Sequence, residues 1–456
     1  MKRLVALVLS FVLLCPLVTV QADELLDITR EFGYEVNPIN RPKTSIVIDA
    51  HTGEILWQDN IDEVRDPASM SKLMALYLVY EAIAEGRMSE DTVITATASD
   101  QAISQIYEIS NNKIVAGVDY TVGELITMTI VPSSNAATIM LANYVSNNDP
   151  DLFIDMMNAK SQELGMTNTT WNNASGASAI SFQGYYAPTR YDREATNLTT
   201  SRDMSILAYN ILNKYPAILQ HTKDAVVTVK AGTPYQEVFD TYNYSLPGAA
   251  YGIEGADGLK TGSSPSAGFN CTLTVKRGEQ RLIGIVMGVG DWSDQQGEYY
   301  RHPFINALVE NAFSDYEYRK LLDAGEETIN GQTYQLTRDF YGTLAKGSQP
   351  VFVVENGQLR LDNGLESVSP LIADTVAVET GKTNQSQSAA STTGAVQTSQ
   401  SSTDWLTVLK TNWYWLLLPL LLLMLATPIV LSQRSKRLRR QRMRERAGER
   451  FRHNRF

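Results

Sequence analysis

The chain contains few cysteines and histidines for its 456 residues. Of its two cysteines, Cys15 lies in an apolar N-terminal run that we expect to be removed, so the mature chain would form no internal disulfide. Cys271 lies in the apolar run 269–275 and is interpreted as a small buried hydrophobe rather than a reactive thiol. No metal-ligand spacing links the four histidines, which are His51, His221, His302 and His453. We therefore expect neither a metal site nor a cofactor.

Basic residues are scarce away from the two ends of the chain. Residues 434–456 carry eleven Lys or Arg against two Glu, and residues 1–22 carry Lys2 and Arg3. Removing the +9 and the +2 of these ends from the total of −11 leaves −22 on the residues between them. An acidic surface argues against a nucleic acid or another polyanion held by general charge. Any anionic ligand would need a local basic site.

Both ends have the composition of targeting segments. Residues 1–22 join Lys2 and Arg3 to an apolar run and a final Val-Gln-Ala, which predicts a secretory signal peptide, with a retained anchor as the less favoured alternative. Residues 413–431 are almost wholly apolar, which predicts a single transmembrane helix, and the nearby aromatic residues suit a membrane interface. The basic residues that follow predict a cytoplasmic tail at 432–456 by the positive-inside rule.

The segment between the ends predicts a main domain at 44–322 after an extended leader at 23–43. Strand patterns occur at 44–50 and 54–58 and return between 225 and 289, whereas the residues between them are mainly helical in pattern. We therefore predict a mixed α/β fold, in which an antiparallel sheet is flanked by helices and a helical subdomain is inserted.

Three other segments have their own character. Residues 167–200 are rich in Asn, Ser, Gly and Tyr, which favours a functional surface loop. Residues 325–379 contain strand patterns and Asn-Gly turn signals, which predict a small β module. Residues 380–404 are mostly Ser, Thr, Gln, Gly and Ala, which predicts a flexible linker.

A serine and a lysine three residues apart open the apolar segment 66–80. Ser69 and Lys72 would share one face of a helix, so the lysine amine can lie against the serine hydroxyl. An amine kept neutral by burial can take the hydroxyl proton. Free backbone N–H groups at the start of the helix can stabilise an oxygen that becomes negative during acyl transfer. The pair predicts a serine nucleophile with a lysine base, although Ser110 and Lys113 show the same spacing by chance.

Two further motifs have a polar pattern suited to a cleft. Ser133 could relay a proton and Asn135 could hold a substrate carbonyl, although a helix cap would explain the same triplet. Lys260 and Thr261 close a predicted strand and can together hold a carboxylate, while Gly262 would let the backbone approach the substrate closely. The alternative for this second motif is the end of a hairpin with an exposed lysine.

Taken in this order, the elements Ser69-x-x-Lys72, Ser133-x-Asn135 and Lys260-Thr261-Gly262 resemble the signature of penicillin-binding proteins and serine β-lactamases. The surrounding phrases narrow the resemblance to the low-molecular-mass D-alanyl-D-alanine carboxypeptidases, serine peptidase family S11. These phrases are residues 67–73, 173–176, 257–262 and 267–270. The similarity covers about residues 40 to 320, with the signal, linker and anchor in the expected places.

The resemblance implies a penicillin-sensitive serine carboxypeptidase that trims the pentapeptide stem of peptidoglycan and takes part in cell-wall biosynthesis and cell shape. Ser69 would attack the penultimate D-alanine and expel the terminal one. Lys72 would act as the base, and Ser133 would relay the proton to the leaving amine. The catalytic domain at 44–322 would stand outside the cell membrane of a Gram-positive bacterium.

The same resemblance assigns the substrate-binding residues. Asn135 would position the substrate amide, and Lys260 and Thr261 would bind its terminal carboxylate beside Gly262. The backbone N–H groups of Ser69 and Ser263 would form the oxyanion hole. Expected partners are the stem peptide, β-lactam antibiotics as covalent inhibitors and the membrane, but no nucleic acid.

The sequence departs from the patterns of related families at two places, and two other kinds of function are also compatible with it. Residues 194–198 do not match the Glu-x-x-Leu-Asn deacylating element of class A β-lactamases, so we expect no efficient destruction of penicillin. The segment after residue 325 is shorter than the β domain of many relatives. A D,D-endopeptidase or transpeptidase would use the same acyl-enzyme, and a non-catalytic wall-binding protein would keep the fold alone.

Overall fold

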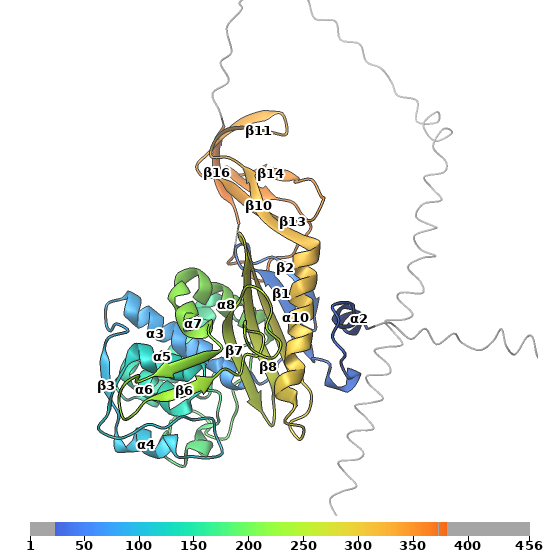
Figure 1. Cartoon of the computed structure of the whole chain (residues 1–456). Coiled ribbons are helices and arrows are strands. Elements are labelled where there is room, and N and C mark those ends of the chain that lie inside the picture. Colours follow the sequence, from blue (N-terminus) through green and yellow to red (C-terminus); the bar gives the residue numbers. More distant parts are fainter. Residues whose placement is uncertain (1–22, 373, 381–456) are drawn as a thin grey trace, which may run out of the picture. The chain divides into compact units, whose positions relative to one another are not determined.

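The computed structural model describes residues 23–372 and 374–380 (Figure 1). The predicted signal peptide, transmembrane segment and cytoplasmic tail, and the linker beyond residue 380, lie outside the described residues. Within 23–372 and 374–380, no helix combines the length and the apolar character needed to cross a membrane.

A five-stranded antiparallel sheet in the order β2-β1-β9-β8-β7 forms the centre of the main domain. Its strands are β1 (Thr44–Asp49), β2 (Ile55–Asp59), β7 (Ala256–Ser264), β8 (Gly268–Arg277) and β9 (Gln280–Val289). The pairing of β1 with β9 joins the start of the domain to its end, and β7 lies at the edge. The predicted mixed α/β fold with an antiparallel sheet built from distant parts of the chain is confirmed.

Both faces of the sheet are buried, because neighbouring residues in its strands are apolar and point to opposite faces. In β1, Ile46 and Ile48 pack into the core under the helical subdomain, whereas Val47 packs into the core on the other face. Helix α10 (Gly297–Asp315) covers this second face, as Figure 1 shows. The edge strand β7 is thereby held rigidly beside the helical subdomain.

The helical subdomain is inserted between β2 and β7. Its elements are the 3₁₀ turns η2 (Ala68–Ser71), η3 (Ala179–Phe182) and η4 (Pro216–Ile218); the helices α3 (Lys72–Ala84), α4 (Ala98–Ser104), α5 (Val122–Ile130), α6 (Asn135–Val145), α7 (Pro150–Leu164), α8 (Ser201–Lys214) and α9 (Leu219–Thr222); and the strand pairs β3 (Val93–Thr95) with β4 (Asp119–Thr121) and β5 (Val226–Val229) with β6 (Glu237–Asp240).

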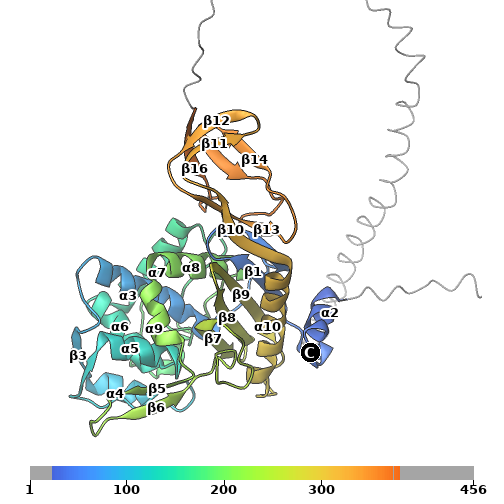
Figure 2. The ribbon, with the colours of Figure 1, turned by 45° about the horizontal axis from the view of Figure 1, so that its top comes forward.

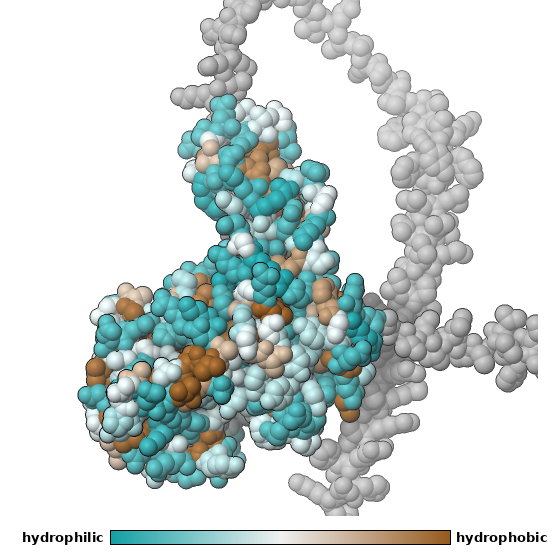
Figure 3. Space-filling model, viewed as in Figure 1, coloured by the Kyte–Doolittle hydropathy of each residue, from teal (hydrophilic) through white to brown (hydrophobic). Residues whose placement is uncertain are grey.

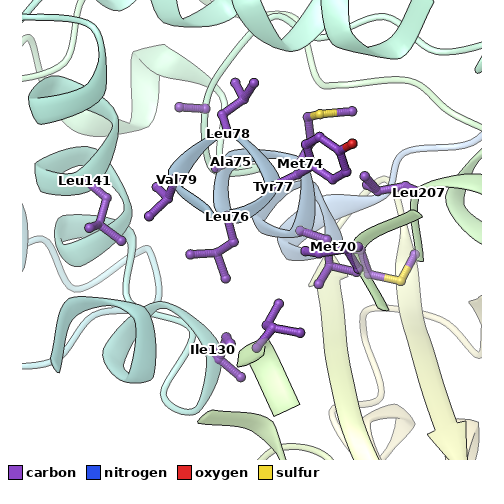
Figure 4. Close-up of a cluster of buried hydrophobic side chains, with 14 of the residues drawn as sticks. Met70, Met74, Ala75, Leu76, Tyr77, Leu78, Val79, Ile130, Leu141 and Leu207 are labelled. Atoms are coloured by element: carbon purple, nitrogen blue, oxygen red, sulfur yellow. The ribbon is translucent and has the colours of Figure 1, made fainter. Parts of the chain in front are cut away.

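Helix α3 is the core of this subdomain. It is apolar all round, and Figure 4 shows Met74, Leu76 and Val79 pointing in different directions from its axis. Such a helix must be enclosed by other elements. Leu141 and Leu207, from α6 and α8, pack into the same core. The turn that precedes α3 is therefore attached to a rigid element.

The predicted extended leader is wrong for residues 24–31. These residues form helix α2 (Glu24–Glu31), which begins at the N-cap Asp23 and is followed by the 3₁₀ turn η1 (Pro38–Asn40). Leu25 and Ile28 are buried at helical spacing, and α2 packs against α10. The short helix is stabilised by this packing, which the polar composition of the segment does not indicate.

The predicted loop at 167–200 is irregular backbone apart from η3 and isolated bridges, but part of it is buried and does not lie at the surface. Trp171, Asn173 and Asn197 have no exposed surface. Several of the buried polar groups are paired: Asn197 Nδ2 donates to Ser71 Oγ at 2.9 Å, and Asn173 Oδ1 accepts from the backbone N–H of Gly176 at 2.7 Å. Asn173 Nδ2 has no partner among the described residues. A polar sequence is compatible with burial where its hydrogen bonds are satisfied internally.

The C-terminal β module begins earlier than the predicted residue 325. Helix α10 ends at Asp315, and β10 (Tyr316–Leu322) pairs with β13 (Phe340–Ala345). A separate five-stranded sheet has the order β11-β12-β16-β15-β14 (Figure 2). Its strands are β11 (Gly325–Ile329), β12 (Gln332–Leu336), β14 (Phe352–Glu355), β15 (Gln358–Leu361) and β16 (Val376–Thr380). Asn330-Gly331 and Asn356-Gly357 have positive φ and form the hairpin turns that these dipeptides indicate.

The face of the molecule in Figure 3 is mainly hydrophilic, with an apolar patch where the β5–β6 hairpin lies. Val226 and Val238 on this hairpin are 56% and 59% exposed. Cys271, by contrast, is fully buried in β8, as the interpretation of this residue as a small hydrophobe predicted.

Candidate active site

A small cleft of about 80 Å³ lies between the η2 turn, the start of α6 and the strand β7. Its walls contain residues from all three predicted motifs, together with five that were not predicted as site residues. The lining residues are Ser69, Ser110, Ser133, Tyr242, Thr261, Gly262, Ser263, Trp292, Glu298 and Arg301. The remaining predicted residues, Lys72, Asn135 and Lys260, are buried directly behind these walls.

Ser69 lies in the 3₁₀ turn η2 and not in the first turn of the α-helix, which begins at Lys72. The preceding residue, Ala68, has φ +47°, a value that non-glycine residues rarely adopt. Its backbone N–H is held by Asp66 Oδ1 at 2.7 Å. The tight turn leaves the Ser69 side chain half-buried at the cleft while the helix behind it is fully enclosed.

Lys72 contacts three oxygen atoms from its fully buried position. Its Nζ lies 2.9 Å from Ser69 Oγ, 2.9 Å from Asn135 Oδ1 and 2.9 Å from the Ser175 carbonyl oxygen. Burial, and after it the charge of Lys260, lowers the pKa of Lys72 well below its ordinary value. A neutral amine has two N–H bonds and one lone pair. If the N–H groups bind Asn135 and Ser175, the lone pair faces the Ser69 hydroxyl and can accept its proton.

Ser133 and Asn135 approach the cleft from the turn before α6. Ser133 has φ +59°, and its buried Oγ has no hydrogen-bond partner within the described part of the chain. The helix cap is instead Ser134, whose Oγ accepts from the backbone N–H of Ala137. Asn135 Nδ2 donates to the Ser110 carbonyl oxygen at 2.9 Å, which fixes the amide that contacts Lys72. The capping interpretation thus applies to Ser134 and leaves the Ser133 hydroxyl free to face the cleft.

Two buried cations lie on the opposite wall. Lys260 on β7 is 2% exposed, and Arg301 from α10 is 0% exposed. Arg301 donates to Ser263 Oγ at 2.9 Å, and within the described residues neither cation forms a salt bridge. Burial, and after it the charge of Arg301, lowers the pKa of Lys260 to about 7. Buried charges without a carboxylate partner create a site that favours an anion.

Arg301 is a site residue that the three motifs do not include. The sequence places it only as the first residue of a closing helix at 301–313. No clear sequence signal marks it, because the helix has a mixed composition and the full burial of the guanidinium is visible only in the structure.

Asp66 is a second residue that the motifs did not identify. Its carboxylate is buried and joins the nucleophile turn to the end of β7. Besides holding the N–H of Ala68, it accepts from Ser264 Oγ at 2.8 Å and from Ser266 Oγ at 2.5 Å. The two elements that would supply the oxyanion-hole N–H groups are therefore tied together by one side chain.

Two glycines allow the backbone to pack closely against the nucleophile turn. A Cβ at Gly262 would lie 2.5 Å from the Pro67 carbonyl oxygen, and one at Gly176 would lie 1.9 Å from the Ala68 carbonyl oxygen. We predicted that Gly262 would allow close approach to the substrate. The structure shows that its missing side chain also allows β7 to approach the turn that carries Ser69. Close approach to the substrate stays a prediction.

Gly176→Ala is expected to destabilise the protein by about 3 kcal/mol or more and to slow acylation by penicillin at least about tenfold, because it pushes the Ser69 turn away from Lys72. Gly184→Ala is the matched control, since Gly184 has the same φ of +93° but no atom within 4 Å of the place that an added Cβ would occupy. Thermal unfolding and the acylation rate would be measured for both variants. Equal effects would show that backbone conformation, and not the close contact, explains the loss.

Comparison with known proteins agrees with this geometry. Residues 35–291 match the family described as D-alanyl-D-alanine carboxypeptidase, peptidase S11. Residues 318–379 match a domain of unknown function, DUF1958.

Individual relatives have low sequence identity to this chain, but the alignments are long. The D-alanyl-D-alanine carboxypeptidase DacF of Bacillus subtilis is 28% identical over 277 residues, which cover 60% of this chain and 63% of the relative. The D-alanyl-D-alanine carboxypeptidase DacA of Haemophilus influenzae is 26% identical over 323 residues, covering 67% and 73% of the two chains. The aligned part thus spans less than two thirds of the Bacillus relative.

A solved structure of a peptidoglycan synthesis regulatory factor (PBP3) from Streptococcus pneumoniae has a TM-score of 0.63 and 26% sequence identity. The alignment covers 75% of this chain and 99% of that protein. The family match spans more than half of the sequence, and it confirms the resemblance carried by the three motifs. The chain therefore belongs to the peptidase S11 family of D-alanyl-D-alanine carboxypeptidases.

Proposed function

We propose that this protein is a serine D,D-carboxypeptidase that removes the terminal D-alanine from peptidoglycan stem pentapeptides. One observation carries the proposal: the buried amine of Lys72 lies 2.9 Å from the half-buried hydroxyl of Ser69. Arg301 lines the same cleft and Lys260 lies directly behind its wall, and these two cations suit a substrate that ends in a carboxylate.

In the acylation step, Ser69 Oγ attacks the carbonyl carbon of the penultimate D-alanine while its proton passes to Lys72 Nζ. The backbone N–H groups of Ser69 and Ser263 stabilise the oxyanion, each by about 3 kcal/mol. The peptide bond then breaks, and the leaving amine receives a proton through Ser133. The products are free D-alanine and an ester between Ser69 and the shortened stem.

In the deacylation step, water attacks the ester carbonyl and gives up its proton to the amine of Lys72. The bond to Ser69 Oγ breaks, and the serine regains its proton. The tetrapeptide stem leaves with a new carboxylate. A penicillin would form the corresponding ester with Ser69, which accounts for covalent inhibition by β-lactams as part of the same proposal.

Incubation with a stem pentapeptide, followed by mass analysis of the products, tests the reaction directly. We expect loss of one alanine residue. Joined stems would identify a transpeptidase, cleavage of cross-linked stems would identify an endopeptidase, and an unchanged pentapeptide would favour a non-catalytic wall-binding protein.

We also propose the location of the enzyme from its sequence. Residues 1–22 direct export, residues 413–431 anchor the chain, and residues 432–456 remain in the cytoplasm. Protease added outside intact cells is expected to remove the catalytic domain and to leave the basic tail protected. Digestion of the tail together with the domain would contradict this orientation.

The pH dependence of kcat/KM is expected to report the charge of Lys260. As the pH rises through about 7, Lys260 loses its proton in the free enzyme and its attraction for the substrate carboxylate falls. Arg301→Gln removes the second cause of the lowered pKa of Lys260, so the fall of kcat/KM with rising pH should begin at a higher pH. At pH 6, kcat/KM should decrease, because one of the two cations is lost. An unmoved limb in the variant would contradict this assignment.

A further inference from the structure

A second hollow, of about 520 Å³, lies in the helical subdomain outside the catalytic cleft. It is bounded by α4, by the C-terminal half of α6 and by the segment that follows η3. Ile103 and Met140 form part of its buried apolar lining. We refer to this hollow as the α4–α6 groove.

The polar side chains of the α4–α6 groove are mostly uncharged. Thr95, Thr97, Ser99, Asn143 and Asn148 supply hydroxyl and amide groups, which can both donate and accept hydrogen bonds. No lysine or arginine lines the groove. This lining does not suit a phosphate or a carboxylate, and its polar groups do not suit a wholly apolar ligand.

The charge of Asp100, which also lines the groove, is used in the capping of α4. Its Oδ2 accepts from the backbone N–H of Thr97 at 2.8 Å and from Thr97 Oγ1 at 2.7 Å. The carboxylate is only 5% exposed. Its Oδ2 is therefore occupied by the cap of α4, and little of the side chain is accessible to a ligand.

Two exposed tyrosines complete the lining. Tyr144 on α6 is 43% exposed, and Tyr185 after η3 is 51% exposed. Aromatic rings with a polar edge are frequent in binding surfaces because they combine apolar area with a hydrogen-bonding group. The C–H face of a sugar ring packs on such a ring while the sugar hydroxyl and amide groups bind Asn, Ser and Thr. The groove has this combination of groups.

Three segments of the chain connect the α4–α6 groove to the catalytic cleft, although no residue lines both. Helix α6 begins with Asn135, which contacts Lys72, and reaches the groove at Asn143 and Tyr144. The segment after α4 leads to Ser110 in the cleft, and the segment that carries the Ser175 carbonyl continues to Tyr185.

The separation along α6 matches the length of a stem peptide. Eight residues from Asn135 to Asn143 correspond to about 12 Å at the rise of an α-helix. The four stem residues that precede the terminal D-alanine span about 13 Å when extended. A stem whose penultimate residue lies at Ser69 can thus place its sugar-linked end at the groove.

We propose that the α4–α6 groove binds the amino-sugar backbone of a peptidoglycan strand while the stem attached to that strand occupies the catalytic cleft. The inference rests on the proposed function, and it adds a second contact by which the enzyme distinguishes strand-borne stems from free peptides. Binding at the groove acts mainly on KM, because it is remote from the reacting bond.

The test compares kcat/KM for one pentapeptide, supplied free and attached to soluble glycan strands. Wild-type protein is expected to prefer the strand-borne form about tenfold, and Tyr144→Ala and Tyr185→Ala are each expected to remove most of this preference through KM. Both variants should hydrolyse the free pentapeptide at the wild-type rate. Tyr144→Phe, which keeps the ring, should keep most of the preference, as should Val351→Ala, which removes an exposed side chain of the β module.

Binding of a stem-free glycan oligosaccharide to the intact Ser69→Ala protein tests the groove independently of catalysis. Binding that is lost in the additional Tyr144→Ala variant supports the proposal, whether or not the wild-type enzyme hydrolyses pentapeptides. No binding, or binding that both tyrosine substitutions leave unchanged, overturns it. Failure of the wild-type protein to hydrolyse the free pentapeptide would instead overturn the proposed function.

Discussion

Covalent labelling by a fluorescent penicillin is expected to disappear when Ser69 is replaced by alanine. The label is an ester with the Ser69 oxygen, so its formation should fall by a factor of at least about 10³. The hydroxyl is half-buried and its only hydrogen bond among residues 23–372 and 374–380 is with Lys72 Nζ at 2.9 Å, so the fold should remain stable without it. Gel fluorescence after a fixed time, together with thermal unfolding, measures both effects.

Ser110→Ala is the matched control for this experiment. Ser110 lines the same cleft and has a lysine three residues later, but its contact with Asn135 uses its backbone carbonyl. Labelling of this variant should persist. If Ser69→Ala and Ser110→Ala proteins were labelled equally, Ser69 could not be the nucleophile.

Replacing Lys72 by arginine is expected to slow acylation by a factor of about 10² to 10⁴, although the positive charge is kept. A guanidinium does not lose its proton at ordinary pH, so it cannot serve as the base. Lys72→Met removes the amine at similar volume and should be equally slow. It should also be less stable by about 1 to 3 kcal/mol, because Asn135 Oδ1 and the Ser175 carbonyl lose a donor.

Comparison of the two variants separates a base from a structural cation. The acylation rate would be followed by stopped-flow fluorescence, and stability by thermal unfolding. If Lys72→Arg protein acylated near the wild-type rate while Lys72→Met protein did not, the site would need a positive charge and not a neutral amine. That result would remove the proposed proton transfer from Ser69 to Lys72.

The sequence was most informative where the pattern is local. Strand patterns at 44–50 and between 225 and 289 predicted strands that the structure contains, and the mainly helical pattern between them matches the helices of the inserted subdomain. It was least informative where stability depends on distant contacts. Helix α2 is held by α10, and the polar segment around Asn173 is buried by hydrogen bonds to residues remote in the chain.

The sequence by itself determined the chemical groups of the candidate site, because the types and spacing of Ser69, Lys72 and Lys260 depend on the chain alone. Only the tertiary structure decided the state of these groups. Burial of Lys72 lowers its pKa, and Arg301 joins the wall of the cleft from a helix far along the chain. Desolvation and the approach of distant backbone segments arise on packing, so no local pattern could reveal them.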